Sequence, residues 1–133
     1  MTVFLSATAT KVAIYLLVRF LFSIFGIALD FRGLPIVEIL LALSIAAMFI
    51  ASIIAVYQSN LKRMLAYSSL AQIGYMMLGI GIANQAGLTG GLVHLVNHAM
   101  MKAALFLAIG SVFYRIGTVR IADIAGIGRR MPL

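Results

Sequence analysis

The sequence has few of the residues on which cofactor proteins and soluble enzymes depend. It contains no cysteine and only three acidic residues among 133. Without cysteine, local metal–thiolate, iron–sulfur and c-type haem sites are excluded, and no redox compartment is indicated. Glycine-rich phosphate loops, dinucleotide-binding fingerprints and nucleophile elbows are also missing from the sequence. The chain therefore shows no catalytic chemistry of these kinds.

Charge of either sign is scarce, and apolar residues are abundant. Charged residues make up 10% of the chain and hydrophobic residues 64%, with a mean hydropathy of +1.15. A soluble domain has about 25% charged and about 45–50% apolar residues. A core of this size cannot hide the excess, so the composition predicts an all-helical integral membrane protein. The net charge of +7 does not indicate nucleic-acid binding, because the basic residues cluster at helix ends.

Four apolar segments of about 20 or more residues are each long enough to cross a hydrocarbon layer of about 30 Å. They cover residues 3–29, 35–57, 61–83 and 87–115. Because the turns between them are short, neighbouring helices should be antiparallel. The predicted fold class is therefore an all-α, polytopic membrane protein with four transmembrane helices. Residues 116–133 are expected to form a connector along the cytoplasmic surface.

The distribution of basic residues predicts the orientation of these helices. One side of the predicted bundle carries six of them: Lys62, Arg63, Arg115, Arg120, Arg129 and Arg130. The other side carries only Arg32, so the first side should face the cytoplasm. The chain is therefore expected to begin in the cytoplasm and to cross four times. It opens without a signal-peptide pattern and both ends are abrupt, which indicates an internal piece of a longer protein.

Three ionisable residues, His94, His98 and Lys102, lie inside the last apolar segment at a spacing of i, i+4 and i+8. These positions drift by only about 80° around a helix and climb about 12 Å, so they share one face. Such groups are costly in lipid and mark a proton or ion path, with Asn97 as a polar neighbour. A structural hydrogen-bonding role is the alternative. A metal site is not favoured, because no nearby carboxylate or thiol completes it.

Two further lysines are candidates for the same path. Lys11, with Thr8 three residues before it, lies at membrane depth, where lost hydration would let it accept and release a proton. A lysine that extends towards the interface is the alternative. Lys62 is either a pathway residue or a positive-inside anchor. Polar residues further along its helix support the pathway role: Tyr67, Ser68, Ser69 and Gln72.

Four stretches together resemble a known family. They are FLSATATKVAIYLLVRF, SNLKRMLAYSSLAQIGYMMLGIGIA, GGLVHLVNHAMMKAALFLAIGSVFYR and IADIAGIGRRMP. These stretches resemble the antiporter-like membrane subunits of respiratory complex I, the proton-translocating NADH:quinone oxidoreductase, and of multisubunit Mrp monovalent cation/proton antiporters. The resemblance is closest to the D-type component of the Mrp antiporters and covers nearly the whole chain.

The resemblance implies a fold of about fourteen transmembrane helices in two inverted repeats, of which this chain would supply the eighth to the eleventh. It implies that Lys11 in TATKVAIY is the central-axis lysine and that Lys62 in LKRMLAYSS leads to the exit half-channel. His94, His98 and Lys102 in HLVNHAMMK would form the relay. The family's paired glutamate and lysine before this region, and its charged residue in the twelfth helix, have no counterpart here.

The predicted function is therefore proton or monovalent cation translocation by a fragment of an antiporter-like subunit in a prokaryotic cell membrane. The choice between proton and sodium or potassium ions is left open. Other membrane subunits and the lipid bilayer are the expected partners. No cofactor is expected in this chain, since the resemblance implies that the flavin and iron–sulfur clusters of complex I lie in other subunits.

Two other classes of function compete with this interpretation. The chain could be a structural subunit whose polar residues serve helix packing and assembly. It could instead be a redox subunit that binds quinone or haem, for example within an NADH:quinone oxidoreductase. Because both histidines lie on one face of one helix, the sequence argues against a bis-histidine haem.

Overall fold

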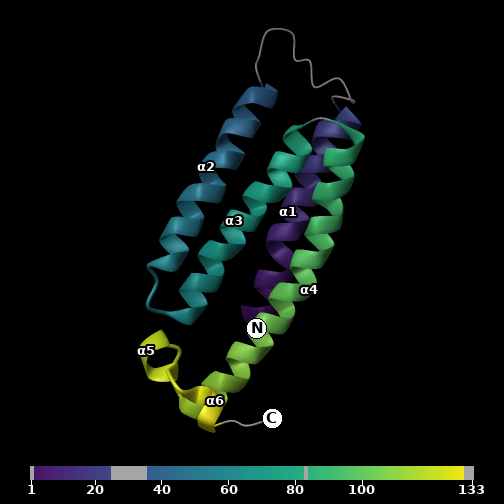
Figure 1. The fold of residues 1–133 in the computed structure, drawn as a ribbon. Coiled ribbons are helices and arrows are strands. Elements are labelled where there is room, and N and C mark those ends of the chain that lie inside the picture. The colour runs from purple at the N-terminus through teal and green to yellow at the C-terminus, as the bar shows by residue number, and fades with distance from the viewer. Residues whose placement is uncertain (1, 25–35, 83, 131–133) are drawn as a thin grey trace.

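The structure, a computed structural model, describes residues 2–24, 36–82 and 84–130, and the elements in these ranges are helices. There are four long helices and two single turns: α1 (Thr2–Ile24), α2 (Ile36–Val56), α3 (Leu61–Gly81), α4 (Gln85–Ile116), α5 (Ile121–Ile124) and α6 (Ile127–Arg130). The long helices lie side by side in up-and-down order, with the α2–α3 turn, α5 and α6 at one end (Figure 1). The end of the first apolar segment and the DFRGLP turn lie outside the described residues.

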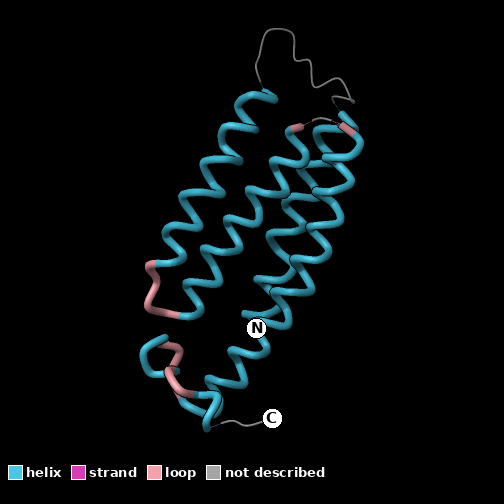
Figure 2. The backbone as a smooth tube through the Cα atoms, in the orientation of Figure 1, coloured by secondary structure: helices cyan, strands magenta, loops and turns pink. Residues whose placement is uncertain are grey.

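α4 begins at Gln85, two residues before the expected start at residue 87. The Asn84 side chain accepts a hydrogen bond from the backbone nitrogen of Gly87 (2.6 Å), so Gln85 already belongs to the first helical turn. The helix ends at Gly117, whose φ of 77° lies in the left-handed region that favours glycine. Beyond it, the expected connector contains the short turns α5 and α6, which Figure 2 shows joined by loops.

Two of the described helices are long and apolar enough to cross a membrane: Val37–Val56, with 20 residues, and Gln85–Ile116, with 32. α3 is also membrane-length, since 21 residues rise about 32 Å. Its polar positions lower its hydropathy: Lys62, Arg63, Ser68, Ser69 and Gln72. α4 rises about 48 Å, which is more than the thickness of about 30 Å of a hydrocarbon layer.

α3 occupies the middle of the bundle and packs against both α2 and α4, while α1 packs mainly against α4. One buried cluster joins Ile14, Val18 and Leu21 of α1 to Met76 and Ile80 of α3. The α1 members recur at i, i+4 and i+7, which is the spacing of one helix face. In contrast, large apolar side chains of α2 such as Phe49 and Val56 are exposed, as expected for a surface that faces hydrocarbon.

Glycines allow α3 and α4 to approach closely near the turn that joins them. A Cβ atom on Gly79 would lie 2.8 Å from the carbonyl oxygen of Gly87 and 3.3 Å from the Cα of Gly91. A Cβ atom on Gly91 would lie 3.2 Å from the carbonyl oxygen of Met76. Helices in a membrane use such small residues to bring their backbones together. This contact sets the distance between the polar faces of α3 and α4.

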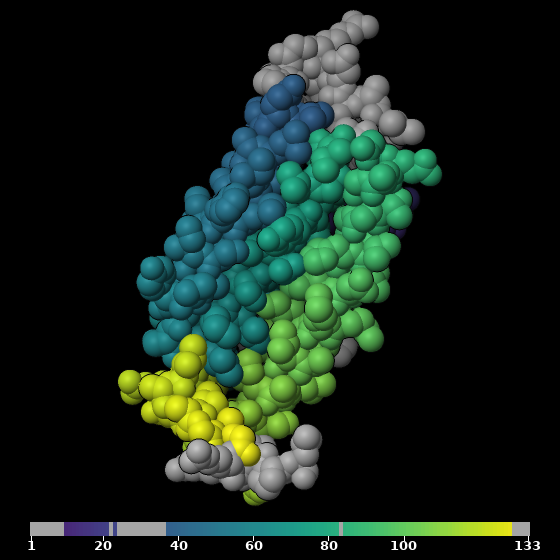
Figure 3. Space-filling view, in the orientation of Figure 1, coloured from purple at the N-terminus to yellow at the C-terminus, as the bar shows by residue number. Residues whose placement is uncertain are grey.

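The opposite end of the α3–α4 pair is closed by the segment that follows α4. The backbone nitrogen of Leu61 donates to the carbonyl oxygen of Val119 (2.9 Å), and that of Ile121 donates to Ser59 (3.0 Å). Leu61 and Val119 also pack against a second buried cluster, made of Leu65, Phe106 and Ile109. Figure 3 shows this C-terminal segment, in yellow, lying against the end of the bundle.

Candidate functional site

Lys102 is held inside the bundle by hydrogen bonds to α3. Its side chain is only 3% exposed. Its Nζ atom donates to the carbonyl oxygen of Leu65 (2.8 Å) and to the hydroxyl of Ser68 (2.5 Å). A buried ammonium group needs such acceptors, because an unpaired charge in an apolar interior is very costly. The lysine of α4 therefore depends on two oxygens of α3.

His94 lies two helical turns before Lys102 and also contacts α3. Its Nε2 atom donates to Oε1 of Gln72 (2.6 Å), which connects positions 22 residues apart. The Tyr75 ring meets the His94 ring edge-on, with centroids 6.2 Å apart. On its own helix, His94 stacks with His98 at a centroid distance of 6.2 Å and an interplanar angle of 14°. One imidazole is thus hydrogen-bonded and lies beside a second.

His98 occupies the centre of this arrangement, four residues from His94 and four from Lys102. It is 2% exposed, and neither ring nitrogen has a hydrogen-bond partner within the described part of the chain. The charges of Lys11, Lys102 and His94 all act on its ring. Leaving a buried polar atom without a partner costs about 1–3 kcal/mol. A group kept at this cost is a candidate for function rather than for packing.

Lys11 brings α1 into the site. Its side chain is 6% exposed and lies on the face of α1 that also carries Ile14 and Val18. Its charge acts on both His98 and Lys102 of α4. Four basic side chains from two helices therefore gather between α1, α3 and α4: Lys11, His94, His98 and Lys102. We call these four residues the basic cluster.

The basic cluster has no carboxylate beside it among the described residues. The chain has three acidic residues: Asp30, outside the described ranges; Glu38, exposed in the first turn of α2; and Asp123 in α5. Two unit charges 6.2 Å apart, the separation of the two imidazole centroids, repel by about 3 kcal/mol at an effective dielectric constant of about 20. Protonation of one member therefore opposes protonation of its neighbour.

Lys62 lies apart from the basic cluster. It is exposed in the first turn of α3, and its Nζ atom lies 4.8 Å from the centre of the Phe113 ring. This is a cation–π contact near the end of α4. Lys62 therefore lies at the end of the bundle that also carries the α2–α3 turn and the C-terminal segment.

The supporting polar residues fall into different environments. Gln72 faces the basic cluster, whereas the hydroxyl of Ser69 donates to the carbonyl oxygen of Leu65 in its own helix (2.9 Å). Tyr67 is half-buried and Asn97 is exposed on α4. The side chain of Thr8 lies outside the described part of the structure.

The sequence prediction counted Ser68 among the polar residues of α3 but chose Ser69 as the supporting residue, whereas Ser68 is the acceptor for Lys102. A signal for Ser68 exists, since it lies four residues before Gln72 and so shares the face of α3 that meets α4. The carbonyl of Leu65 has no such signal, because backbone acceptors cannot be distinguished by residue type.

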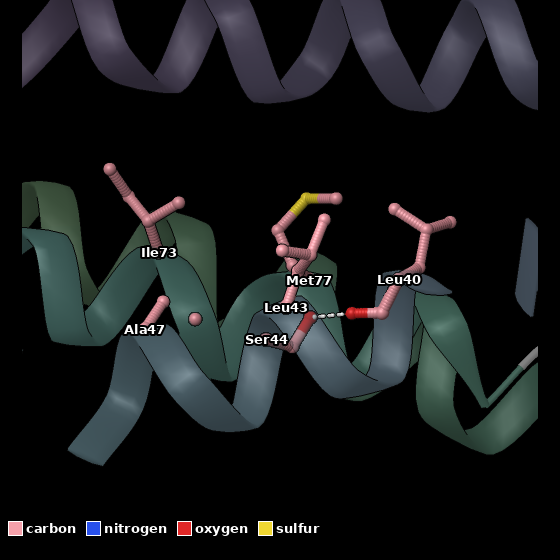
Figure 4. A pocket seen from close by; sticks show the side chains of 7 residues that line it. Leu40, Leu43, Ser44, Ala47, Ile73 and Met77 are labelled. Atoms are coloured by element: carbon pink, nitrogen blue, oxygen red, sulfur yellow. Dashed lines mark hydrogen bonds between the residues drawn. The ribbon is translucent and has the colours of Figure 1, made fainter. Parts of the chain in front are cut away.

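An apolar cavity of about 200 Å³ between α2 and α3 is separate from the basic cluster. Its lining is Leu40, Leu43, Ser44, Ala47, Ile73, Gly74 and Met77. Figure 4 shows the Ser44 hydroxyl turned to the carbonyl oxygen of Leu40, to which it donates (2.6 Å). The cavity is therefore suited to apolar contacts. Within the described residues, no group of three or more histidine, cysteine or acidic side chains could hold a metal ion.

Buried basic groups inside a bundle of apolar, membrane-length helices define a class of protein: integral membrane domains with an ionisable interior. Comparison with known proteins makes the assignment specific. Residues 1–133 match the family described as NADH:quinone oxidoreductase/Mrp antiporter, TM, and the chain belongs to this family. The prediction of an all-α domain of an antiporter-like membrane subunit is thereby confirmed.

Several curated relatives resemble this chain along much of its length. NADH-quinone oxidoreductase subunit N of Desulforudis audaxviator is 39% identical over 130 residues, which cover 98% of this chain and 26% of the relative. NADH-quinone oxidoreductase subunit M of Rhodobacter capsulatus is 33% identical over 131 residues, which cover 98% of this chain and 25% of the relative. Formate hydrogenlyase subunit 3 of Escherichia coli is 40% identical over 105 residues, which cover 71% of this chain and 17% of the relative.

The chain thus spans about a quarter of the length of the first of these relatives. No solved structure matches the chain.

Proposed function

We propose that this chain helps to move protons, or monovalent cations in exchange for protons, across a membrane as part of an antiporter-like subunit. The observation that carries the proposal is the position of His98. Its two ring nitrogens are buried without partners among the described residues, and its ring stacks with that of His94, with 6.2 Å between the centroids. Histidine exchanges protons near neutral pH, so an imidazole placed in this way can receive and pass a proton.

The geometry supports a chain of transfers rather than direct contact between all members. The imidazole centroids are 6.2 Å apart, which is too far for a direct hydrogen bond between the rings. Water entering the bundle would bridge the members of the basic cluster. The members of the basic cluster repel one another when charged. Arrival of a proton at Lys11 or His94 would therefore favour the release of a different proton from Lys102. Lys62, at the end of the bundle, would receive or supply protons there.

Within this proposal, all four long helices cross the membrane, with the end that carries Lys62 in the cytoplasm. Support comes from the hydrogen bonds that fix the segment after α4 to the α2–α3 turn, since they gather the basic residues at one end. Other membrane subunits would surround the chain, since its relatives are named as subunits of larger complexes.

The closer assignment to the D-type component of Mrp antiporters also remains a proposal. The relatives described above carry the names of NADH-quinone oxidoreductase and formate hydrogenlyase subunits.

The test is proton transport in membrane vesicles that contain the assembled protein. We expect Lys102→Met, which keeps the length of the side chain and removes its amine, to reduce transport at least about tenfold, since a required proton carrier is lost. Lys11→Met should have the same effect. Arg19→Gln is the matched control, because Arg19 is a basic residue of α1 that is exposed. Transport at the normal rate in Lys102→Met vesicles would refute the proposal.

One observation favours the structural alternative. The bonds of Lys102 to Leu65 and Ser68 join α4 to α3 and so contribute to packing. If packing were the only role, Lys11→Ala would lower the amount of assembled protein, and the molecules that did assemble would transport normally. Transport must therefore be expressed per assembled molecule, with the amount measured by immunoblot of the same vesicles.

A further inference from the structure

The end of the bundle near Lys62 carries a cluster of basic side chains, of which the proposed proton path uses only Lys62. Four exposed basic residues lie there: Lys62 and Arg63 in the first turn of α3, Arg115 in the last turn of α4, and Arg120 just before α5. They come from three places in the sequence. We call them the basic rim.

Backbone hydrogen bonds bring the members of the basic rim together. Residues 59–61 and 119–121 exchange two such bonds, from Leu61 to Val119 and from Ile121 to Ser59. The Asn60 side chain caps α3 by accepting from the backbone nitrogens of Lys62 and Arg63. The rim is thus fixed to the bundle by main-chain contacts rather than gathered by flexible loops.

The basic rim has little negative charge of its own. Of the two acidic residues in the described ranges, Asp123 belongs to this end, and Glu38 lies in the first turn of α2. Its Oδ2 atom already accepts a hydrogen bond from the hydroxyl of Thr118 (2.9 Å). Lys62 lies over the Phe113 ring rather than beside a carboxylate. The rim is therefore a surface with an excess of positive charge, since its four basic side chains face one carboxylate, Asp123, within the described residues.

Aromatic and apolar side chains accompany the basic rim. Tyr114, next to Arg115, is 91% exposed, and Phe113 and Ile121 are also exposed. Tyrosine is enriched where membrane helices meet the headgroup layer. Because α4 is longer than the hydrocarbon layer is thick, its last turns reach that level when its buried residues lie within the membrane.

From these observations, we propose that the basic rim binds the headgroups of anionic phospholipids, with phosphate groups lying between the start of α3 and the segment that follows α4. An excess of positive charge next to an exposed tyrosine suits a phospholipid, whose anionic headgroup would contact the basic side chains while its acyl chain lies against the helices. This inference does not depend on proton transfer. An acidic surface of a neighbouring protein is the competing occupant.

A photocrosslinker placed at Tyr114 separates the two occupants. The full assembly, with Tyr114 replaced by p-benzoylphenylalanine, is reconstituted in vesicles of equal parts phosphatidylglycerol and phosphatidylcholine. The vesicles are then irradiated, and the crosslinked adducts are identified and quantified by mass spectrometry. We expect lipid adducts in which phosphatidylglycerol exceeds phosphatidylcholine by about fivefold, the effect expected for a single basic contact, or more.

Charge-neutral variants and salt test the origin of that excess. Arg63→Gln combined with Arg120→Gln should bring the ratio of the two lipids close to one, whereas Arg19→Gln should leave it unchanged. High salt should lower the ratio without any substitution, which provides a second measurement if the double variant fails to assemble. The proposal would be overturned if the protein with an unsubstituted basic rim gave a ratio of phosphatidylglycerol to phosphatidylcholine adducts near one. Crosslinking mainly to another protein chain would also overturn it.

Discussion

Replacement of Gly79 by alanine should separate α3 from α4. The added Cβ atom would lie 2.8 Å from the carbonyl oxygen of Gly87, whereas ordinary contacts begin at 3.4 Å. The atoms that the new Cβ would meet belong to the backbone of Gly87 and Gly91, so no flexible side chain can move aside. The two backbones must therefore move apart by about 0.6 Å. Forcing extra volume into a packed interior costs about 1–3 kcal/mol. We expect Gly79→Ala to lower the free energy of unfolding by about 2 kcal/mol.

Gly90→Ala is the matched control for this prediction. Gly90 lies in α4 close to the same contact, but a Cβ atom there would meet nothing within 4 Å. Alanine at this position should be neutral or should stabilise the helix by about 0.5–1 kcal/mol, because it restricts the unfolded chain. Both variants add one methyl group to a helical glycine, but only Gly79→Ala is expected to lower the free energy of unfolding.

The assay is unfolding of the chain in detergent micelles, followed by helical circular dichroism. The midpoint of Gly79→Ala should lie below that of the unsubstituted chain, and the midpoint of Gly90→Ala at or above it. The same separation should weaken the bond between His94 and Gln72, which lies about two turns from Gly79. If both alanines were tolerated equally, the close approach of α3 and α4 described above would be incorrect.

Single hydrogen bonds on α3 give two further predictions. Asn60→Ala removes the cap of α3 and should destabilise the chain by about 1 kcal/mol in the same unfolding assay, whereas Asn60→Ser should retain most of the stability. Ser68→Ala removes one acceptor of the buried Lys102 ammonium and should cost about 1–3 kcal/mol, more than Ser111→Ala, whose exposed hydroxyl bonds only within α4. An equal effect of the two serine variants would contradict the placement of Lys102.

Part of the basic cluster is predictable because it lies on one helix. The spacing of His94, His98 and Lys102 alone places them on one face of a helix. In the structure, His98 and Lys102 are buried and His94 is half-buried. The all-α class follows in the same direct way from the length of the apolar segments. Periodicity within one segment requires no knowledge of how segments pack.

The contacts between helices were not predictable in this way. Lys11 is buried beside α4 only because α1 packs against α4, and no residue pattern specifies that pairing. The choice of Ser68 rather than Ser69 depends on the rotation of α3, and only the spacing of Ser68 from Gln72 points to it. The cap at Asn84, which moves the start of α4 to Gln85, is a local signal that the sequence prediction missed.

The central claim is that the buried imidazole of His98 serves proton transfer rather than packing, and His98→Leu tests it most directly. Leucine fills much of the same volume and removes two buried nitrogens that have no hydrogen-bond partner in the described part of the chain, so assembly should be normal or better. Proton transport per assembled molecule, measured in vesicles, should fall at least about tenfold, since the central carrier is gone. Transport at the unsubstituted rate in well-assembled His98→Leu vesicles would contradict the account.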